Sequence, residues 1–273
     1  MSPISLSNRL LQSVLAIAKQ AGDHISAFYA QSVAVHTKSD NTPVTEADLF
    51  VSQFLTEKLT ALTPDIPVLS EENCGTPLEV RSKWTQYWLI DPLDGTQQFI
   101  NRTGQFSVMI ALIVQNRPVL GVIHAPILGC SYYAMQNCGA FKQDENGTVQ
   151  LAKRQIDFSQ PLRITLGNAK KIDQVRSFLN PNLRYEFQVF GSSGLKGARV
   201  AEGVADCYVR LGDTGEWDTA AAQVLLGETN GLIFDRTFAP LSYNQRETFI
   251  NPDFIMCADK GVNWGNIFQS NTP

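Results

Sequence analysis

Residues 88–96 read Trp-Leu-Ile-Asp-Pro-Leu-Asp-Gly-Thr and join an apolar run to two carboxylates and a glycine. The apolar run predicts a buried strand that ends at Asp91, where a proline turn would carry Asp94. Gly95 and Thr96 then stand where a helix would begin, so free backbone N–H groups should lie beside the two carboxylates. Carboxylates bind cations, and the amides at a helix start bind phosphate oxygens. This stretch therefore predicts a site for metal-assisted phosphate chemistry.

The bulk composition is that of an ordinary globular protein. The chain has 273 residues, of which 44% are hydrophobic and 18% charged, so it is long enough for two domains or one large layered domain. The net charge of −4 gives no sign of a nucleic-acid groove or of an anionic membrane surface as partner. A negatively charged small-molecule substrate is still compatible with this charge, because bound metals reverse its sign locally.

Cysteine usage and hydropathy favour a cytoplasmic protein. The five cysteines are odd in number and widely spaced, which favours reduced thiols over a disulfide frame or a zinc site. The longest apolar run, residues 108–114, is far shorter than the ~20 residues that cross a bilayer. The N-terminus lacks a basic segment followed by a long apolar run, so no secretory signal and no integral membrane segment are predicted.

The first half of the chain predicts two helices packed against an antiparallel-rich sheet. Apolar spacing predicts helices over residues 7–30 and 45–62, and Thr45 with Asp48 forms a capping box that starts the second helix. Strands are predicted at residues 66–70, 87–90, 106–114, 118–124 and 131–135, with hairpin connections at 115–117 and 144–147. We expect residues 1–160 to form an N-terminal α+β subdomain that holds most of the metal ligands.

The second half alternates between strands and helices. Strands are predicted at residues 162–166, 185–190, 207–211 and 254–257, and helices at 171–179, 195–202 and 217–226. Such alternation favours a smaller α/β layer. We expect residues 161–273 to form a C-terminal α/β subdomain that supplies Asp218 and substrate contacts. An α/β chain with two subdomains and an active site between them is the predicted layout.

Several acidic residues allow both a structural and a functional interpretation. Glu71 and Glu72 follow a predicted strand, but a glutamate pair in a loop is usually solvated surface. Asp218 stands at a predicted helix start and could simply cap it, as Asp48 could within its capping box. Asp91 is harder to explain structurally, since an unpaired charge at the end of an apolar strand is costly. The alternative for Asp91 is a turn residue followed by a helix cap.

Taken in order, the motifs resemble those of the inositol monophosphatase superfamily of magnesium-dependent, lithium-sensitive phosphatases. The ordered set is Thr45-x-x-Asp48, Glu71-Glu72, residues 91–96, residues 139–141 and Trp217-Asp218-Thr-Ala-Ala. Within the superfamily, the chain is similar to the 3′(2′),5′-bisphosphate nucleotidases of the CysQ type. That similarity lies in residues 67–72, 87–96, 191–196, 201–203, 240–243 and 249–252. The resemblance spans nearly the whole chain and implies a layered αβαβα sandwich, the inositol monophosphatase-like sugar phosphatase fold.

The resemblance implies a set of metal ligands. Glu71, Asp91 and the Leu93 carbonyl would hold a first magnesium ion. Asp91, Asp94 and Asp218 would hold a second, and Glu71 would also face a weaker third ion. The assignment agrees with the chemistry of these residues, because converging carboxylates repel each other unless divalent ions neutralise them, and magnesium prefers oxygen ligands.

The same resemblance implies roles in catalysis and substrate binding. Thr96 and Asp48 resemble the family's water-activating pair, in which the hydroxyl orients the attacking water and the carboxylate accepts its proton. The implied substrate-binding residues are Glu71, Leu93, Asp94, Gly95, Thr96, Ser192, Ser193, Lys196 and Asp218. Ser192, Ser193 and Lys196 would contact the nucleoside and its remaining phosphate. The alternative for Lys196 is an exposed lysine on a helix.

The implied activity is hydrolysis of the 3′-phosphate of adenosine 3′,5′-bisphosphate to AMP and inorganic phosphate, with two or three Mg²⁺ per site, in sulfur metabolism. The 3′-phosphate of the activated sulfate donor is a further expected substrate, and a homodimer is expected because relatives often pair. The alternatives are an inositol or sugar phosphate monophosphatase and a non-catalytic metal or nucleotide sensor. Two departures bear on the substrate: Gln97-Gln98 replace the usual Lys-Glu, and Gly194 is an extra residue between Ser193 and Leu195.

Overall fold

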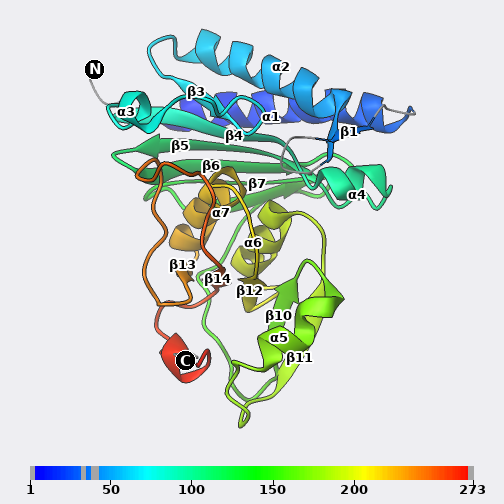
Figure 1. Ribbon diagram of the computed structural model, residues 1–273, viewed down its shortest axis with the longest axis vertical. Helices are drawn as coiled ribbons and strands as arrows, with labels where there is room; N and C mark the ends of the chain where they lie inside the picture. Colours follow the sequence, from blue (N-terminus) through cyan, green and yellow to red (C-terminus); the bar gives the residue numbers. More distant parts are fainter. Residues whose placement is uncertain (1–3, 32–34, 38–42, 270–273) are drawn as a thin grey trace.

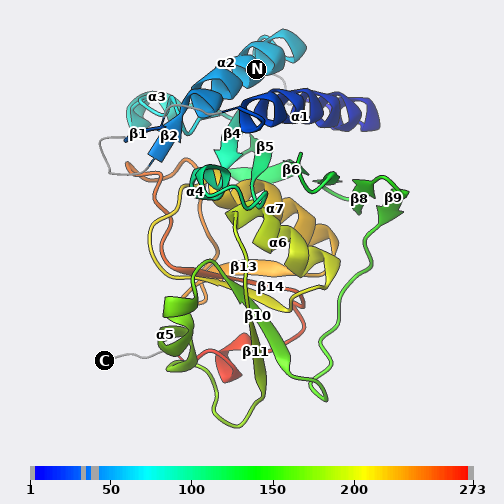
Figure 2. The same cartoon turned by 90° about the vertical axis from the view of Figure 1, so that its right-hand side faces the viewer.

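The computed structural model describes residues 4–31, 35–37 and 43–269, and arranges them in alternating layers of helix and sheet (Figure 1). An outer pair of helices covers a large sheet, and a second pair separates this sheet from a smaller one (Figure 2). Short helices cover the far face of the smaller sheet. The αβαβα sandwich predicted for the chain is confirmed.

The large sheet has the strand order β3-β4-β5-β6-β7-β8-β9. Its strands are β3 (Val68–Ser70), β4 (Gln86–Asp94), β5 (Ser107–Val114), β6 (Arg117–Ala125), β7 (Cys130–Met135), β8 (Ala140–Asp144) and β9 (Gly147–Gln150). All neighbours pair antiparallel except β3, which runs parallel to β4. The outer helices are α1 (Asn8–Tyr29) and α2 (Glu46–Leu62). The predicted pair of helices on an antiparallel-rich sheet is therefore present.

The small sheet has the strand order β11-β10-β12-β14-β13. Its strands are β10 (Leu162–Leu166), β11 (Tyr185–Val189), β12 (Cys207–Arg210), β13 (Leu232–Asp235) and β14 (Phe254–Cys257). Between the sheets lie α6 (Ser193–Glu202) and α7 (Trp217–Glu228), and both pack on the large sheet. The remaining elements are β1 (Val35–Thr37), β2 (Pro43–Thr45), α3 (Leu78–Arg81), α4 (Thr96–Ile100), η1 (Ala169–Lys171), α5 (Ile172–Arg176) and η2 (Trp264–Asn266).

Burial on both faces explains why β4 is so apolar. Trp88 and Ile90 pack into the core under α1 and α2, whereas Tyr87 and Leu89 pack into the core that surrounds α6 and α7. A strand buried on both faces has no polar side to alternate with, so its sequence is a continuous apolar run. The layers are therefore joined by apolar cores on each side of the large sheet. The subdomain division near residue 160 stays a prediction.

Three details differ from the sequence predictions. The strand expected to end at Asp91 continues to Asp94, because Pro92 lies in an irregular part of β4 and not in a turn. The helix expected over residues 171–179 is shorter, as η1 followed by α5. The strands β1, β2, β8, β9 and β13 were not predicted; they are short, and β9 is exposed along its whole length.

Other sequence expectations concern cysteines and membranes. Within the described residues, each of the five cysteines is a free thiol, and the buried pair Cys207 and Cys257 lies with the sulfurs 3.9 Å apart. Where the structure describes the chain, no helix combines the length and the apolar character needed to span a bilayer.

Candidate active site

A bulge in β4 brings two aspartates to one side of the strand. Asp91 pairs with Met109 of β5 and Asp94 pairs with Ser107, so β4 has one residue more than its partner in this interval. Side chains three residues apart in a regular strand point to opposite faces, and the extra residue removes that opposition. Pro92 is tolerated because a bulged residue need not donate a ladder hydrogen bond.

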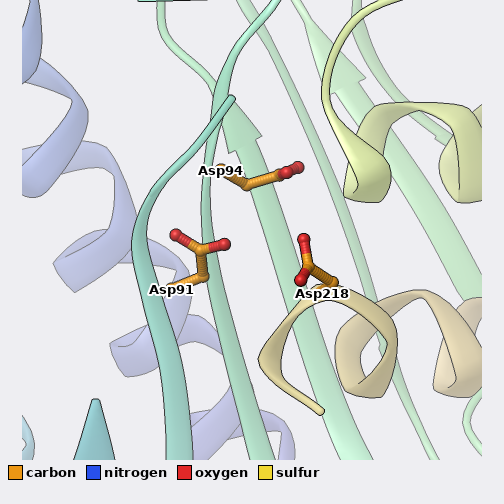
Figure 3. A group of neighbouring side chains, drawn as sticks. All are labelled: Asp91, Asp94 and Asp218. Atoms are coloured by element: carbon orange, nitrogen blue, oxygen red, sulfur yellow. The ribbon is translucent and has the colours of Figure 1, made fainter. Parts of the chain in front are cut away.

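The two aspartates converge on a third from α7. Figure 3 shows Asp91, Asp94 and Asp218 pointing toward one another, and an oxygen from each lies within 4.8 Å of the others. Glu71 directly follows β3, whose Ser70 pairs with Ile90 in parallel register, so Glu71 comes beside Asp91. The structure thus brings together the four carboxylates that the sequence singled out.

The environment of this cluster disfavours four negative charges. Burial raises the pKa of Asp91 well above its usual range, and the charges of Glu71, Asp94 and Asp218 raise it further. Burial also raises the pKa of Asp218, with Asp94 and Glu71 adding to the shift. An oxygen-only donor set with surplus negative charge fits a hard divalent cation. The residues present therefore fit a metal site.

Asp48 and Thr96, predicted to act together, are in contact. The Thr96 hydroxyl donates a hydrogen bond to Asp48 Oδ1 at 2.9 Å. Asp48 Oδ2 accepts from the Thr45 amide at 2.7 Å and from the Thr45 hydroxyl at 2.6 Å. Because one carboxylate has room for several donors, Asp48 caps α2 and contacts Thr96 at once. The capping box predicted at Thr45 is confirmed.

The loop between β4 and α4 supplies backbone groups to the same site. Gly95 is the N-cap of α4 and has φ 98°, a left-handed conformation that favours glycine. A Cβ at this position would also lie 3.2 Å from the Gln105 carbonyl oxygen. The Leu93 amide donates to Asp91 Oδ1 at 3.0 Å, and the Leu93 carbonyl oxygen lies 3.3 Å from the Thr96 hydroxyl.

Ser192 and Ser193 reach the site at the start of α6, where they contact Asp94. The Ser193 amide donates to Asp94 Oδ1 at 2.9 Å, and the Ser192 hydroxyl donates to Asp94 Oδ2. The Ser193 hydroxyl instead lies 3.0 Å from the Tyr208 hydroxyl. Their expected substrate contacts stay predictions.

Lys196 is buried, so the alternative of an exposed helix lysine is wrong. Its side chain is 3% exposed, and Nζ donates to the Ser192 carbonyl at 2.5 Å. Nζ also lies 4.8 Å from the centre of the Tyr208 ring. Burial lowers the pKa of Lys196 to about 8, partly offset by the charges of Asp94 and Asp218.

Arg210 and Phe190, which sequence reasoning missed, lie at the edge of the small sheet. The parallel strands β11, β10 and β12 end side by side, so the register places Gly167 between Phe190 and Arg210. A Cβ at Gly167 would come within 3.7 Å of Lys196 Nζ and 3.9 Å of Arg210 Nη1. The signal available was three parallel strands whose carboxyl ends meet at one edge, the usual place for ligands.

One cavity joins these groups. It has a volume of about 320 Å³, and its lining includes Glu71, Asp94, Asp218, Lys196 and Arg210. A larger cavity, about 1080 Å³, lies around the C-terminal half of α7 and has none of the clustered carboxylates in its lining. The smaller cavity therefore carries the chemistry, since clustered carboxylates and two cations line it together.

Comparisons with known proteins assign this architecture to a family. The sequence model of the Inositol monophosphatase family matches residues 8–260. A solved structure of CysQ from Bacteroides thetaiotaomicron, described as a bacterial member of that family, is 28% identical with a TM-score of 0.76 and covers 92% of this chain and 98% of its own. An inositol monophosphatase structure from Thermotoga maritima, 23% identical, shares the fold with a TM-score of 0.76 over 92% of both chains. The chain therefore belongs to the inositol monophosphatase family.

Curated relatives confirm the predicted resemblance to the CysQ type. The chain is 60% identical over 266 residues to a protein of Aggregatibacter actinomycetemcomitans named 3′(2′),5′-bisphosphate nucleotidase CysQ, covering 97% of this chain and 99% of that one. The protein of the same name from Haemophilus influenzae is also 60% identical, over 98% of this chain and 100% of its own. The namesake from Escherichia coli K12 is 38% identical over 90% of this chain and 98% of its own.

Proposed function

We propose that the chain is a magnesium-dependent 3′(2′),5′-bisphosphate nucleotidase that converts adenosine 3′,5′-bisphosphate to AMP and inorganic phosphate. The names of the 60% identical relatives support the reaction class. The observation that carries the substrate class is the cavity that holds the carboxylate cluster and also Lys196 and Arg210. A substrate with a single phosphate has one anionic group for this site. A bisphosphate can place its second phosphate on the two cations.

The metal ligands would be the four clustered carboxylates and one carbonyl. Glu71, Asp91, Asp94, Asp218 and the Leu93 carbonyl would hold two or three magnesium ions between them. When bound, magnesium supplies Lewis acidity and neutralises charge on the phosphate and on the leaving oxygen. The amides of Gly95 and Thr96 would donate hydrogen bonds to oxygens of the same phosphate.

The proton of the attacking water would leave through Thr96. Because the Thr96 hydroxyl donates to Asp48 at 2.9 Å, its oxygen has lone pairs free to accept a hydrogen bond from water. As the water oxygen bonds to phosphorus, its proton would pass to Thr96 Oγ1, whose own proton would pass to Asp48. The carboxylate thus ends protonated and the P–O bond to the ribose breaks. The departing ribose oxygen would take a proton from a solvent water, and Asp48 would return its proton to solvent, so the reaction balances.

The second phosphate and the base would bind at the edge of the small sheet. Lys196 and Arg210 flank Gly167, which has no side chain to fill the space between them. Phe190 is partly buried with Arg199 stacked 4.5 Å from its ring centre, and it borders the same cavity. An adenine ring could stack on an aromatic side chain held in this way. The 3′-phosphate of the activated sulfate donor would fit the same arrangement.

The test is phosphate release from adenosine 3′,5′-bisphosphate and from inositol 1-phosphate, each with and without magnesium. We expect magnesium-dependent release from the nucleotide at least tenfold faster than from the polyol. Faster magnesium-dependent release from inositol 1-phosphate would support the proposed metal site but contradict the proposed nucleotide substrate. Release from neither, with magnesium bound, would favour a sensor.

A variant sharpens this test. Arg210→Gln should raise KM for the bisphosphate about tenfold or more, since a charge-assisted hydrogen bond contributes about 1.5–3 kcal/mol. The KM for inositol 1-phosphate should not change. Arg176→Gln is the matched control, because Arg176 stacks on Phe187 on the outer side of the small sheet. An unchanged KM in Arg210→Gln would contradict the proposed phosphate contact.

Three further expectations belong to this proposal. Millimolar lithium should inhibit turnover, because a small monovalent ion can take a magnesium position without supplying its charge. Unchanged turnover in lithium would count against the proposed ion set.

Analytical ultracentrifugation should show a homodimer, and cell fractionation should place the protein in the cytoplasm.

A further inference from the structure

The carboxylate of Asp94 is held on both oxygens by the first turn of α6. The Ser193 amide donates to Oδ1 at 2.9 Å, and the Gly194 amide donates to Oδ2 at 2.8 Å. The Ser192 hydroxyl also donates to Oδ2. Asp94 belongs to β4 and these donors follow it by about a hundred residues, so a distant part of the chain fixes the orientation of a proposed metal ligand.

The backbone conformation and the hydrogen bonds of Ser192 hold its hydroxyl against Asp94. Its φ is 57° and its ψ 132°, a strained conformation for a residue with a side chain. Its hydroxyl accepts from the Leu195 amide at 3.1 Å while donating to Asp94. A serine hydroxyl has a single proton to donate, so none is left for a substrate oxygen. The strained backbone of Ser192 therefore directs its hydroxyl to Asp94.

Ser107 completes the support from the side of the large sheet. It is fully buried on β5, opposite Asp94, and its hydroxyl donates to Asp94 Oδ2 at 3.3 Å. The Ser107 and Ser192 oxygens are 3.1 Å apart. Asp94 Oδ2 thus has hydroxyl donors from two different elements.

Gly194, the extra residue, permits the close approach of α6. A Cβ at this position would lie 2.5 Å from the Met109 sulfur and 3.2 Å from Asp94 Oδ2. A separation of 2.5 Å is well inside van der Waals contact, and because Met109 is itself buried, a side chain at Gly194 would crowd both this methionine and the Asp94 carboxylate. The glycine lets its own amide reach the carboxylate.

We infer that Ser192, Ser107 and Gly194 are positioning residues that act through Asp94, setting its carboxylate for a divalent metal ion. The inference rests on the proposed function for the identity of the metal site. Partners of a ligand that fix its orientation commonly raise metal affinity by about 10–100-fold. Ser192 then serves the metal site, and a direct contact with the substrate is not its role.

The test measures Mg²⁺ and Mn²⁺ binding to the substrate-free protein by calorimetry. Ser192→Ala and Ser107→Ala should each weaken metal binding by about 10–100-fold. Ser131→Ala is the matched control: Ser131 is also buried in the large sheet, but its hydroxyl bonds His124 at 2.9 Å. Its metal affinity should match that of the wild type.

Gly194→Ala provides an independent arm. It should weaken metal binding about tenfold or more, because the added methyl group crowds the Asp94 carboxylate. Gly227→Ala is its control, since a Cβ at Gly227 meets nothing within 4 Å. Thermal unfolding in EDTA establishes that each variant folds. If Ser192→Ala does not fold, Ser107→Ala and Gly194→Ala still decide the question.

The outcomes separate this inference from the proposed function. Wild-type metal affinity in all three variants, with a raised KM for the bisphosphate in Ser192→Ala, would assign Ser192 to the substrate and overturn the inference. Wild-type protein that binds metal but releases no phosphate would overturn the proposed function alone. Wild-type protein that binds no divalent metal would overturn both.

Discussion

Thr96 links the buried carboxylate of Asp48 to the open cavity. If this hydroxyl relays the proton of the attacking water, Thr96→Val should lower kcat about 100-fold or more, the usual contribution of general acid–base catalysis. Thr96→Ser keeps the hydroxyl and should retain most of the activity. Steady-state kinetics with adenosine 3′,5′-bisphosphate measures both variants. Equal kcat in Thr96→Val and wild type, with unchanged metal binding, would remove Thr96 from the mechanism.

Single residues were predictable where a motif stated their type and spacing. The family resemblance implied that Asp48 contacts Thr96 as well as capping its helix, and that Asp91, Asp94 and Asp218 converge, and the structure has these contacts. Arg210 was missed because an arginine at the end of a short strand has no local feature that marks it. Its place beside Gly167 depends on the pairing of β10 with β12, which no local pattern reveals.

At the scale of elements, α7 lies against the large sheet through a glycine contact. A Cβ at Gly121 of β6 would come 2.5 Å from the Ala221 carbonyl oxygen and 2.8 Å from its Cα, both backbone atoms that cannot rotate away. Gly121→Ala should therefore destabilise the protein by about 1–3 kcal/mol. Urea unfolding measures this change.

The helix control for that experiment is again Gly227→Ala. Because its Cβ meets open space, the substitution should leave stability unchanged or raise it by up to about 1 kcal/mol. A Gly121→Ala variant as stable as the wild type would mean that α7 can shift without cost. Since α7 carries Asp218, metal binding by Gly121→Ala should weaken together with stability.

The contact between α1 and β6 predicts acid sensitivity. His124 lies under Gly22 of α1, and burial, with help from Lys19, lowers its pKa to about 4, while Asp23 opposes the shift. Above pH 6.5 the histidine is neutral in both the folded and the unfolded chain. Below that pH, His124 binds a proton in the unfolded chain but stays neutral in the folded one. The free energy of unfolding therefore falls between pH 6.5 and about 4.

His124→Gln tests this contribution, because glutamine does not titrate. The free energy of unfolding of the wild type minus that of the variant should decrease as the pH falls from 6.5 toward 4, by at most about 1.4 kcal/mol per pH unit. Urea midpoints at several pH values give this difference. A difference that does not vary with pH would show that His124 keeps an ordinary pKa in the folded protein.

Elements with strong periodicity were predicted and those shaped by their partners were not. The apolar spacing of α1 and α2 predicted these helices, and the alternation in the second half indicated the small sheet. The bulge in β4 escaped prediction because proline in a strand usually signals a turn. Only the pairing with β5 shows that the strand continues to Asp94.

At the scale of the whole molecule, the metal site joins distant parts of the chain. Asp91 and Asp94 come from β4, whereas Asp218 comes from α7. Metal bound only by the folded protein should add about 3 kcal/mol of stability at a hundred times its Kd. For a chain of this size that corresponds to a rise in Tm of about 5–12 °C. Thermal unfolding with magnesium and with EDTA measures the shift.

Asp94→Asn is the control for this shift. The substitution removes one ligand charge, so it should abolish most of the stabilisation by magnesium and lower phosphate release by orders of magnitude. A full shift in Asp94→Asn would mean that magnesium stabilises the protein at another place. The layered αβαβα arrangement was implied by the family resemblance, whereas the order of helices and strands predicted only two helices on one sheet and a smaller α/β layer. The packing of α6 and α7 between the sheets required the structure, because burial on two sides leaves a helix without a clear polar face.

The distance along the chain between β4 and α7 has a consequence during synthesis. A polypeptide emerging from the ribosome exposes Asp91 and Asp94 long before α6 and Trp217-Asp218 follow. Until then the two aspartates have neither the α6 amides nor the third carboxylate, and water alone solvates their charge. A nascent chain that stops before Trp217 cannot complete the ion site. On the proposed mechanism, a chain that ends before Trp217 lacks Asp218 and is therefore expected to release no phosphate.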